Sequence, residues 1–228
     1  MLNTVLVPIA REGRPFIAIF AVLTIVLAWI ADWLVVPGLI LTAWCVYFFR
    51  DPARVTPTRQ GLIISPADGV VVAAGLAPWP KELGMGEGET QRVCIFMNVF
   101  DVHVNRVPVD GRIEKLVYVP GAFVNASLDK ASEKNERQLV AMTTADDRPL
   151  AFVQIAGLVA RRIVCKITEG QEMRAGERMG LIRFGSRVDV YLPPDIAPLV
   201  ALGQRCVAGE TVIADITAQE PAREGEVR

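Results

Sequence analysis

The chain has 228 residues, of which 52% are hydrophobic, and its net charge is −1. This length allows one large domain or a domain with an appendage, and the balanced charge provides no basic field that would attract nucleic acid. The four cysteines lie far apart in the sequence and the chain has a single histidine, which makes a Cys/His zinc site improbable. We therefore expect neither a nucleic-acid partner nor a bound metal.

A long apolar stretch, residues 16–49, follows a short N-terminal segment, residues 1–15, and carries only one charge, Asp32. As one straight helix it would be about 51 Å long, well beyond a membrane core of roughly 30 Å. Two shorter helices fit better, joined near Ala31-Asp32 or bent at Pro37-Gly38. The expected helices are Phe16–Ile30 and Trp33–Phe49.

Basic residues flank this apolar stretch on both sides, with Arg11 and Arg14 before it and Arg50, Arg54 and Arg59 after it. Positive residues favour the cytoplasmic side of a membrane. A hairpin whose two ends both face the cytoplasm satisfies this rule, whereas a single span does not. Each arm is short for a full span, so a shallow or re-entrant hairpin is also possible. A buried hairpin in a soluble core is the alternative to membrane insertion.

After a polar linker, residues 50–60, the hydrophobic pattern changes to the period of two that is typical of strands. Asp68-Gly69 is a favourable hairpin turn, and the simplest role for Asp68 is that of a turn-capping carboxylate. Further strands are expected over several apolar runs: 93–98, 111–118, 139–143, 150–155, 158–167, 179–184 and 211–216. The chain is therefore predicted to be mainly β, with an apolar helical hairpin at its N-terminus.

The single histidine, His103, lies in a run of β-branched residues, with Asp101 and Asn105 two positions away on either side. In a strand these three side chains would share one face and form a polar stripe within an apolar run. Histidine titrates near neutral pH and is a common proton carrier. A buried histidine with satisfied hydrogen bonds is the structural alternative.

One internal repeat is visible, because residues 170–177 (GQEMRAGE) match residues 203–210 (GQRCVAGE). Each copy combines turns of small residues with a following strand. Two such units suggest a pseudo-symmetric barrel or sandwich. Similar turns occur in lipoyl and biotinyl carrier domains, but neither copy has a lysine at its tip, which argues against a carrier.

Gly185-Ser186 lies between the two copies, within the strand-like run 181–192. Glycine leaves its carbonyl accessible to a neighbouring hydroxyl. If the Ser186 hydroxyl attacks the Gly185 carbonyl, the amide becomes an ester, and elimination then cuts the chain and leaves a dehydroalanine that hydrolyses to a pyruvoyl group. A Gly-Ser pair more often marks a bend or bulge in a strand.

Several stretches, in order and spacing, together resemble the phosphatidylserine decarboxylase family, and specifically its short proteobacterial proenzymes. The resemblance covers about residues 10–216. The stretches that carry it are FFRDP at 48–52, SPADG at 65–69, FMNVFDVHVNR at 96–106, NER at 135–137 and FGS at 184–186.

The resemblance implies self-cleavage between Gly185 and Ser186, with Ser186 as the nucleophile that becomes the pyruvoyl group and forms a Schiff base with the substrate. It also implies an Asp-His-Ser set for cleavage, and Asp68 and Ser186 match its positions. Longer members have two histidines three residues apart. Here His103 matches the first, and Arg106 replaces the second, so His103 serves both steps or another base assists cleavage. Arg187 replaces the usual Thr or Ser.

The implied fold is a β-rich catalytic domain related to the barrel-sandwich hybrids. The implied reaction converts phosphatidylserine to phosphatidylethanolamine and CO₂, with His103 as the proton donor. Candidate substrate-binding residues within the matching stretches are Asn105, Arg106, Asn135 and Arg137. The predicted division is an N-terminal segment (1–15), a membrane-associated hairpin (16–49), a linker (50–60), a catalytic domain (61–217) and a loose tail (218–228), with cleavage giving a β chain (1–185) and an α chain (186–228).

The expected partners are phosphatidylserine in the membrane, the two chains of one precursor, and further copies in a homo-oligomer. The expected location is the cytoplasmic face of the inner cell membrane. Two alternatives stay open at this point. One is an archaetidylserine decarboxylase, which would use the same headgroup chemistry. The other is a membrane-tethered β-barrel binding module that never cleaves.

Overall fold

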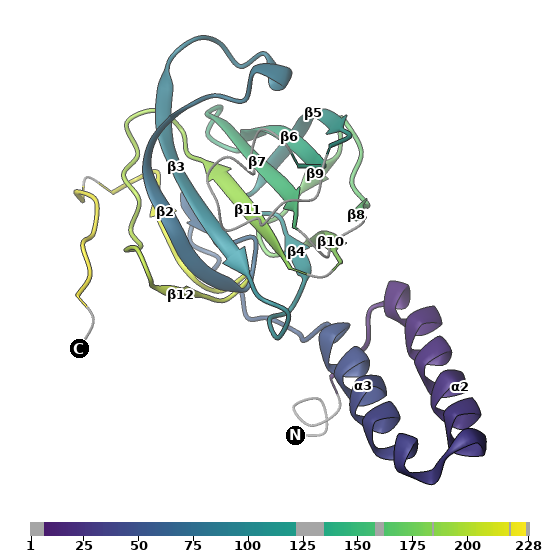
Figure 1. Ribbon diagram of the computed structural model, residues 1–228. Coiled ribbons are helices and arrows are strands. Elements are labelled where there is room, and N and C mark those ends of the chain that lie inside the picture. Colours follow the sequence, from purple (N-terminus) through teal and green to yellow (C-terminus); the bar gives the residue numbers. More distant parts are fainter. Residues whose placement is uncertain (1–6, 122–134, 158–161, 184, 219, 227–228) are drawn as a thin grey trace.

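A computed structural model of the chain describes residues 7–121, 135–157, 162–183, 185–218 and 220–226. Two helices project from one end of a β domain, which confirms the predicted fold class (Figure 1). The helices are α2 (Arg14–Ile30) and α3 (Val35–Phe48), and the strands are β1 (Leu62–Ile64), β2 (Gly69–Pro78), β3 (Glu89–Met97), β4 (Val104–Arg106), β5 (Gly111–Val119), β6 (Arg137–Thr144), β7 (Pro149–Ala156), β8 (Ile163–Cys165), β9 (Glu172–Met173), β10 (Arg178–Ile182), β11 (Ser186–Tyr191), β12 (Arg205–Cys206) and β13 (Val212–Asp215).

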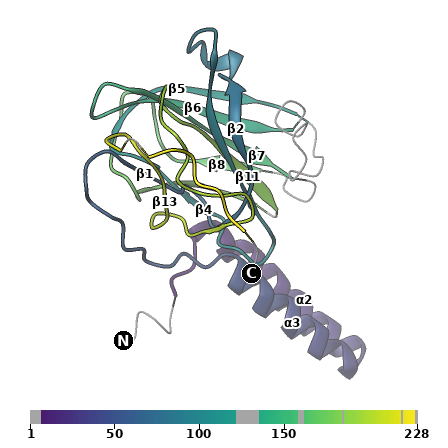
Figure 2. The same ribbon diagram turned by 90° about the vertical axis from the view of Figure 1, so that its left-hand side faces the viewer.

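The two helices run side by side and are joined through the short 3-10 turn Asp32–Leu34, so the chain reverses near Ala31-Asp32 and not at Pro37-Gly38 (Figure 2). Their interface contains a hydrogen-bonded pair, Thr24 and Thr42, with 3.2 Å between the two hydroxyl oxygens. Gly38 lies against Thr24, where a Cβ on residue 38 would come within 2.8 Å of the threonine side chain. Small residues at this crossing therefore allow the helices to approach closely, as at membrane-helix interfaces.

Most of the apolar surface of the hairpin is exposed. Trp29 is 86% exposed, Trp33 is 73% exposed and Ile30 is 71% exposed. The stretch Arg11–Ile30 is long and apolar enough to cross a membrane, whereas Asp32–Phe48 is shorter. A contiguous exposed apolar surface of this kind is typical of a membrane-interacting element.

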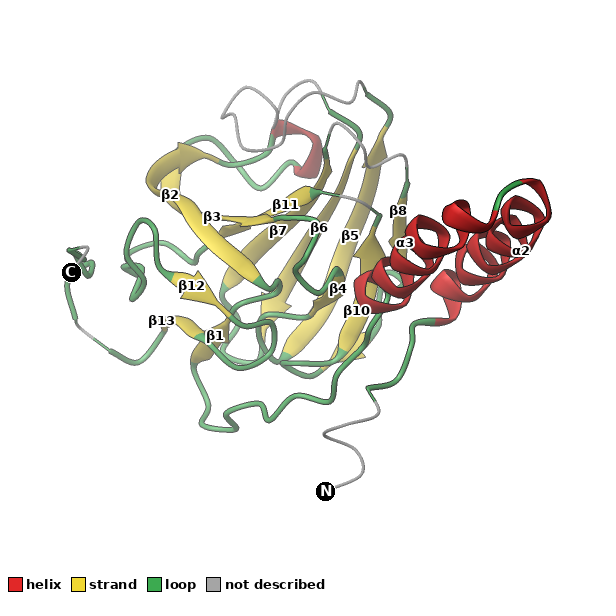
Figure 3. Ribbon diagram, turned by 60° about the horizontal axis from the view of Figure 1, so that its bottom comes forward, coloured by secondary structure: helices red, strands yellow, loops and turns green. Residues whose placement is uncertain are grey.

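Strands of the described residues form a curled eight-stranded sheet in the order β12-β2-β3-β11-β7-β6-β5-β9, together with a three-stranded sheet, β4-β10-β8, and a β1-β13 pair (Figure 3). The inner side of the curl holds the main apolar core, which includes Ile63, Ile95, Phe152 and Val188. β11 is central in the large sheet, between β3 and β7.

The internal repeat accounts for the two edges of the large sheet. β9 lies in the first copy and pairs with the start of β5, at Gly111 and Arg112. β12 lies in the second copy and pairs with the start of β2, at Gly69 and Val70. The two copies thus occupy equivalent places at opposite ends of one sheet, which confirms the predicted pseudo-symmetry.

Four strand predictions were wrong in detail. The run 181–192 is not one strand, because the chain leaves β10 and enters β11 of a different sheet through Gly185, whose φ is +66°. Asp101 and His103 precede β4 and lie in a turn, although both are buried. Asp68-Gly69 does not join the two strands of a hairpin, because β1 pairs with β13 whereas β2 pairs with β12 and β3. Of the predicted strand 158–167, residues 158–161 lie outside the described residues and β8 is limited to Ile163–Cys165.

Candidate active site

The turn between β10 and β11 brings His103 to the predicted cleavage point. The Gly185 N–H donates a hydrogen bond to His103 Nε2 at 3.2 Å. His103 Nδ1 lies 3.0 Å from the Asp101 carbonyl oxygen, which can only accept, so Nδ1 carries the proton. The imidazole is therefore in one defined neutral tautomer, with the Nε2 lone pair directed at the scissile segment.

Ser186 is the first residue of β11 and is fully buried. It lies opposite Met97 of β3 and Ala156 of β7, and its hydroxyl is 4.0 Å from the Met97 sulfur. Gly185 has a left-handed backbone that favours glycine, and a Cβ there would meet nothing within 4 Å. The glycine is thus required for the turn, and the space beside it is open.

His103 is 2% exposed, and burial lowers the pKa of its imidazole to about 4, against the raising effect of the Asp101 hydrogen bond. A neutral imidazole at neutral pH can accept a proton but has none to give at Nε2. In the uncut chain, His103 is therefore equipped as a base.

Asp68 lies immediately before β2 and is held by partners of its own. Its Oδ2 forms an ion pair with Arg54 at 2.7 Å, and its Oδ1 accepts the Ala208 N–H at 2.7 Å. Burial raises the pKa of the Asp68 carboxyl, and the charge of Asp101 acts in the same direction. Within the described residues, no hydrogen bond links Asp68 to His103 or Ser186, and its role in cleavage stays a prediction.

Asn105 and Asn135 both lie near Ser186. Asn105 is fully buried, donates to the Met97 sulfur at 3.5 Å, and accepts from Gln154 Nε2 at 2.8 Å. Asn135 donates to the carbonyl of Ala156, the residue opposite Ser186, at 2.7 Å. Asn105 is thus part of a polar group on the inner side of the sheet, whereas Asn135 fixes the end of β7.

The two arginines in the predicted substrate set point elsewhere. Arg106 donates to the Gly176 and Pro52 carbonyls at 2.7 and 2.9 Å and so ties the linker to the first repeat. Arg137 forms an ion pair with Glu82 and lines a cavity of about 650 Å³ on the opposite face of the large sheet from Ser186. A direct contact of either side chain with a substrate at residue 186 stays a prediction.

Three further residues shape the site, and none was singled out from the sequence. Met97 provides the surface that faces the serine hydroxyl, and Phe48 stacks on His103 with ring centroids 4.3 Å apart. Gln154 orients Asn105, and its own Oε1 has no partner within the described residues. A polar residue inside the predicted apolar strand 150–155 was the one available signal for Gln154.

Arg187 is buried on the reverse face of β11, where it forms a two-point ion pair with Asp189 at 2.7 and 2.9 Å. Replacing Arg187 with methionine is expected to lower the free energy of unfolding by about 1 to 3 kcal/mol, because Asp189 loses its two-point partner and stays buried with Arg92, at 4.0 Å, as its remaining charged partner. Adding Asp189→Leu should recover most of the loss. Chemical denaturation of both variants in detergent, on an uncleaved background, tests this, and equal stability of the single variant and the parent would contradict it.

The comparisons with known proteins agree in one family. A family model described as phosphatidylserine decarboxylase matches residues 41–214. Curated proteins named phosphatidylserine decarboxylase proenzyme are similar over nearly the whole length. The protein from Paramagnetospirillum magneticum is 60% identical and the alignment covers 97% of this chain and 92% of that protein. The one from Rhodospirillum rubrum is 58% identical, and the alignment covers 99% of this chain and 97% of that protein. The one from Cereibacter sphaeroides is 56% identical, and the alignment covers 100% of this chain and 98% of that protein.

Proposed function

The chain belongs to the phosphatidylserine decarboxylase family, and we propose that it becomes active by cutting itself between Gly185 and Ser186. It is an enzyme, a carboxy-lyase that converts phosphatidylserine to phosphatidylethanolamine and CO₂. The observation that supports the cleavage site best is the hydrogen bond at 3.2 Å between the Gly185 N–H and His103, immediately before the buried Ser186.

The proposed cleavage begins when the Ser186 oxygen bonds to the Gly185 carbonyl carbon and its proton passes to a base, for which His103 is the candidate. The C–N bond then breaks as the nitrogen takes up a proton, which leaves an ester. Loss of the Ser186 α-proton expels the Gly185 carboxylate and gives an enamine. Addition of one water and release of one ammonia convert this enamine to a pyruvoyl group. The balance requires no oxidant.

The surroundings of residue 186 fit this pyruvoyl group. Its methyl would replace the CH₂OH of serine against the Met97 sulfur and Ala156, which are weakly polar and apolar surfaces. The ketone supplies an electrophile for the serine amine of the lipid and an electron sink as the carboxylate leaves. A proton must then reach the α-carbon of the headgroup, and His103, which is hydrogen-bonded to the neighbouring Gly185 N–H, is the candidate to hold and deliver it.

We propose that the hairpin keeps this site at the membrane surface. Its exposed apolar residues, including Trp29 and Trp33, enter the lipid, while Arg11 and Arg14 at the base of α2 stay in the cytoplasm. Asp68 as a participant in cleavage, and association into a homo-oligomer, belong to the same proposal. The archaetidylserine and non-cleaving alternatives are not favoured, because the matched relatives are proenzymes named for phosphatidylserine.

Intact mass of the purified protein, before and after borohydride, tests the proposal. We expect two chains, one that ends at residue 185 and one that starts at residue 186. The smaller chain should resist N-terminal sequencing and gain two hydrogens on reduction, because borohydride reduces its ketone. A single chain of 24.9 kDa that decarboxylates phosphatidylserine would contradict the proposed cleavage, although not the family.

A further inference from the structure

The membrane hairpin ends on the catalytic histidine. Phe48, the last residue of α3, is 1% exposed. Its ring lies 4.3 Å from the imidazole of His103, centroid to centroid, at an angle of 34°. One face of the imidazole is therefore covered by a residue of the lipid-facing element, not by the β domain.

Phe48 is itself held from several sides. Trp44 lies 5.7 Å from it and Phe49 5.0 Å from it, in each case between ring centroids. The same apolar cluster includes Val104 of β4 and Leu181 of β10. β4 begins directly after His103, and β10 ends shortly before Gly185. The end of α3 thus packs into the walls of the site, and it cannot move without disturbing them.

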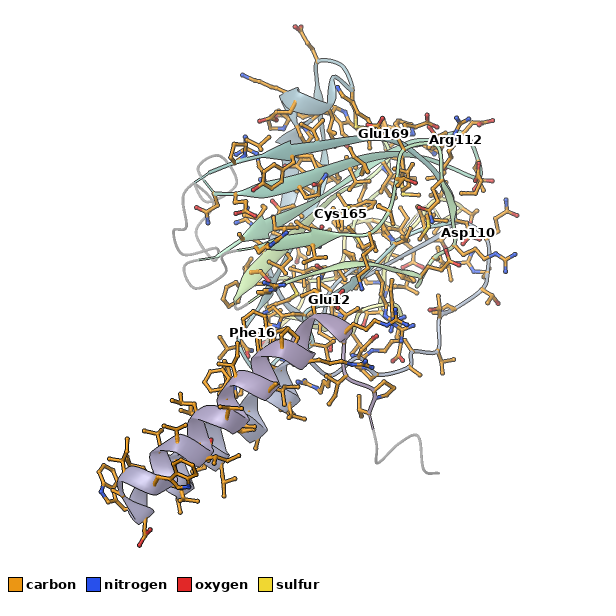
Figure 4. The ribbon with its side chains drawn as sticks, turned by 90° about the vertical axis from the view of Figure 1, so that its right-hand side faces the viewer. Glu12, Phe16, Asp110, Arg112, Cys165 and Glu169 are labelled. Carbon is orange, nitrogen blue, oxygen red and sulfur yellow. The ribbon has the colours of Figure 1, made fainter. Side chains whose placement is uncertain are left out.

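The first helix is fixed to the same region. Phe16 of α2 stacks on Phe49 at 5.6 Å, and the Arg183 guanidinium lies 5.0 Å from the Phe16 ring, just before the cleavage turn. Glu12 forms an ion pair with Lys166 at 2.6 Å, near the end of β8. Figure 4 shows Glu12 and Phe16 where the helices meet the β domain.

We propose that Phe48 is a positioning residue that holds the His103 imidazole against the Gly185 N–H, so that the membrane hairpin also forms one wall of the active site. His103 needs such support because it lies in a turn before β4 and its Nδ1 has only a backbone carbonyl as partner. Hydrogen bonds alone leave the ring free to tilt, whereas an aromatic neighbour fixes its plane.

Loss of the Phe48 ring should change the pKa of His103, which also depends on the charged groups nearby. Asp101, in the same turn, favours the protonated imidazole, and Arg50, just after α3, disfavours it. Burial outweighs both. Removing the Phe48 ring would admit water to one face of the imidazole, so the pKa should rise from about 4 toward the ordinary value of about 6.5.

The test uses the full chain in detergent. Phe48→Ala is expected to slow self-cleavage at least tenfold, and Phe48→Leu, which keeps bulk, should recover part of the rate. Trp29→Ala and Trp33→Ala at the far end of the hairpin are the controls. They should leave cleavage unchanged and reduce activity only on vesicles of phosphatidylserine, not on a short-chain soluble phosphatidylserine.

A second readout separates positioning from general damage to the fold. Because the chain has one histidine, labelling histidine with nitrogen-15 gives a single imidazole signal set, which can be recorded on the uncleaved Ser186→Ala chain. Phe48→Ala should shift the signals from the Nδ1–H tautomer toward a mixture, with thermal unfolding still cooperative.

The proposal rests on the proposed role of His103, and the two can fail separately. Normal cleavage of Phe48→Ala with an unchanged tautomer would overturn the positioning role while leaving His103 as the base. Normal cleavage of His103→Gln would overturn the role of the histidine itself. Loss of cleavage in the Trp29 and Trp33 controls would show that the hairpin as a whole, and not Phe48 in particular, determines cleavage, and would overturn the positioning role.

Discussion

Replacing Ser186 with alanine is expected to leave a single chain of 24.9 kDa that has no measurable decarboxylase activity. Alanine removes the only oxygen that can carry the acyl group of Gly185, so no ester forms and no ketone appears at residue 186. Because Ser186 is fully buried and the Met97 sulfur, at 4.0 Å, is the hydrogen-bond partner of its hydroxyl within the described residues, the fold should tolerate the change. Denaturing electrophoresis and a phosphatidylserine assay measure both outcomes.

Ser186→Cys is the matched control for this prediction. A thiolate attacks the same carbonyl and gives a thioester, which can undergo the same elimination, so partial cleavage should return. Cleavage of Ser186→Ala at its normal position would mean that another group attacks the Gly185 carbonyl. In that case the pyruvoyl group could not arise from this residue, and the proposed function would lose its central step.

The sequence indicated the parts of this architecture that depend on local pattern. The apolar run 16–49 became two helices because no charge interrupts either arm, and the turn formed where Asp32 lies. The repeat at 170–177 and 203–210 placed short strands at both edges of one sheet, because each copy repeats the same glycine turns. These features are set by periodicity and turn chemistry, which a single sequence contains.

The contacts of the site depend on tertiary packing, and periodicity alone could not predict them. Phe48 meets His103 across about 55 positions of sequence, through the way that α3 packs on β4 and β10. The strand-like run 181–192 contains a sheet change, which only the conformation of Gly185 reveals.

Arg187 is a further case. The sequence showed only that it departs from the usual residue of the family at this position. Its partner, Asp189, lies two positions along the same strand, where both side chains emerge on the same buried face. The structure therefore accounts for the arginine as one half of a buried ion pair that holds the start of β11.

His103→Gln is expected to slow self-cleavage by about 10²- to 10⁴-fold, the range typical of a lost general base. Glutamine retains a polar group near the Gly185 N–H but cannot take up a proton. Hydroxylamine treatment shows at which step the variant stops, because hydroxylamine directly cleaves an ester between residues 185 and 186. If the variant stalls after the ester forms, hydroxylamine will cut it between residues 185 and 186. If cleavage of the untreated variant is as fast as in the parent, another group is the base.

The pH dependence should distinguish the two proposed roles of His103. Cleavage requires the neutral imidazole, so its rate should be level from about pH 7 to pH 5 and fall only as the pH approaches the lowered pKa of about 4. Decarboxylation requires a proton at Nε2, which the neutral tautomer lacks. The phosphate and carboxylate of the bound lipid should favour uptake of that proton by raising the pKa. Single-turnover decarboxylation should therefore slow toward high pH, whereas cleavage does not. A cleavage rate that already falls between about pH 7 and pH 6 would mean that the imidazole titrates as an exposed histidine and that its burial does not govern the reaction.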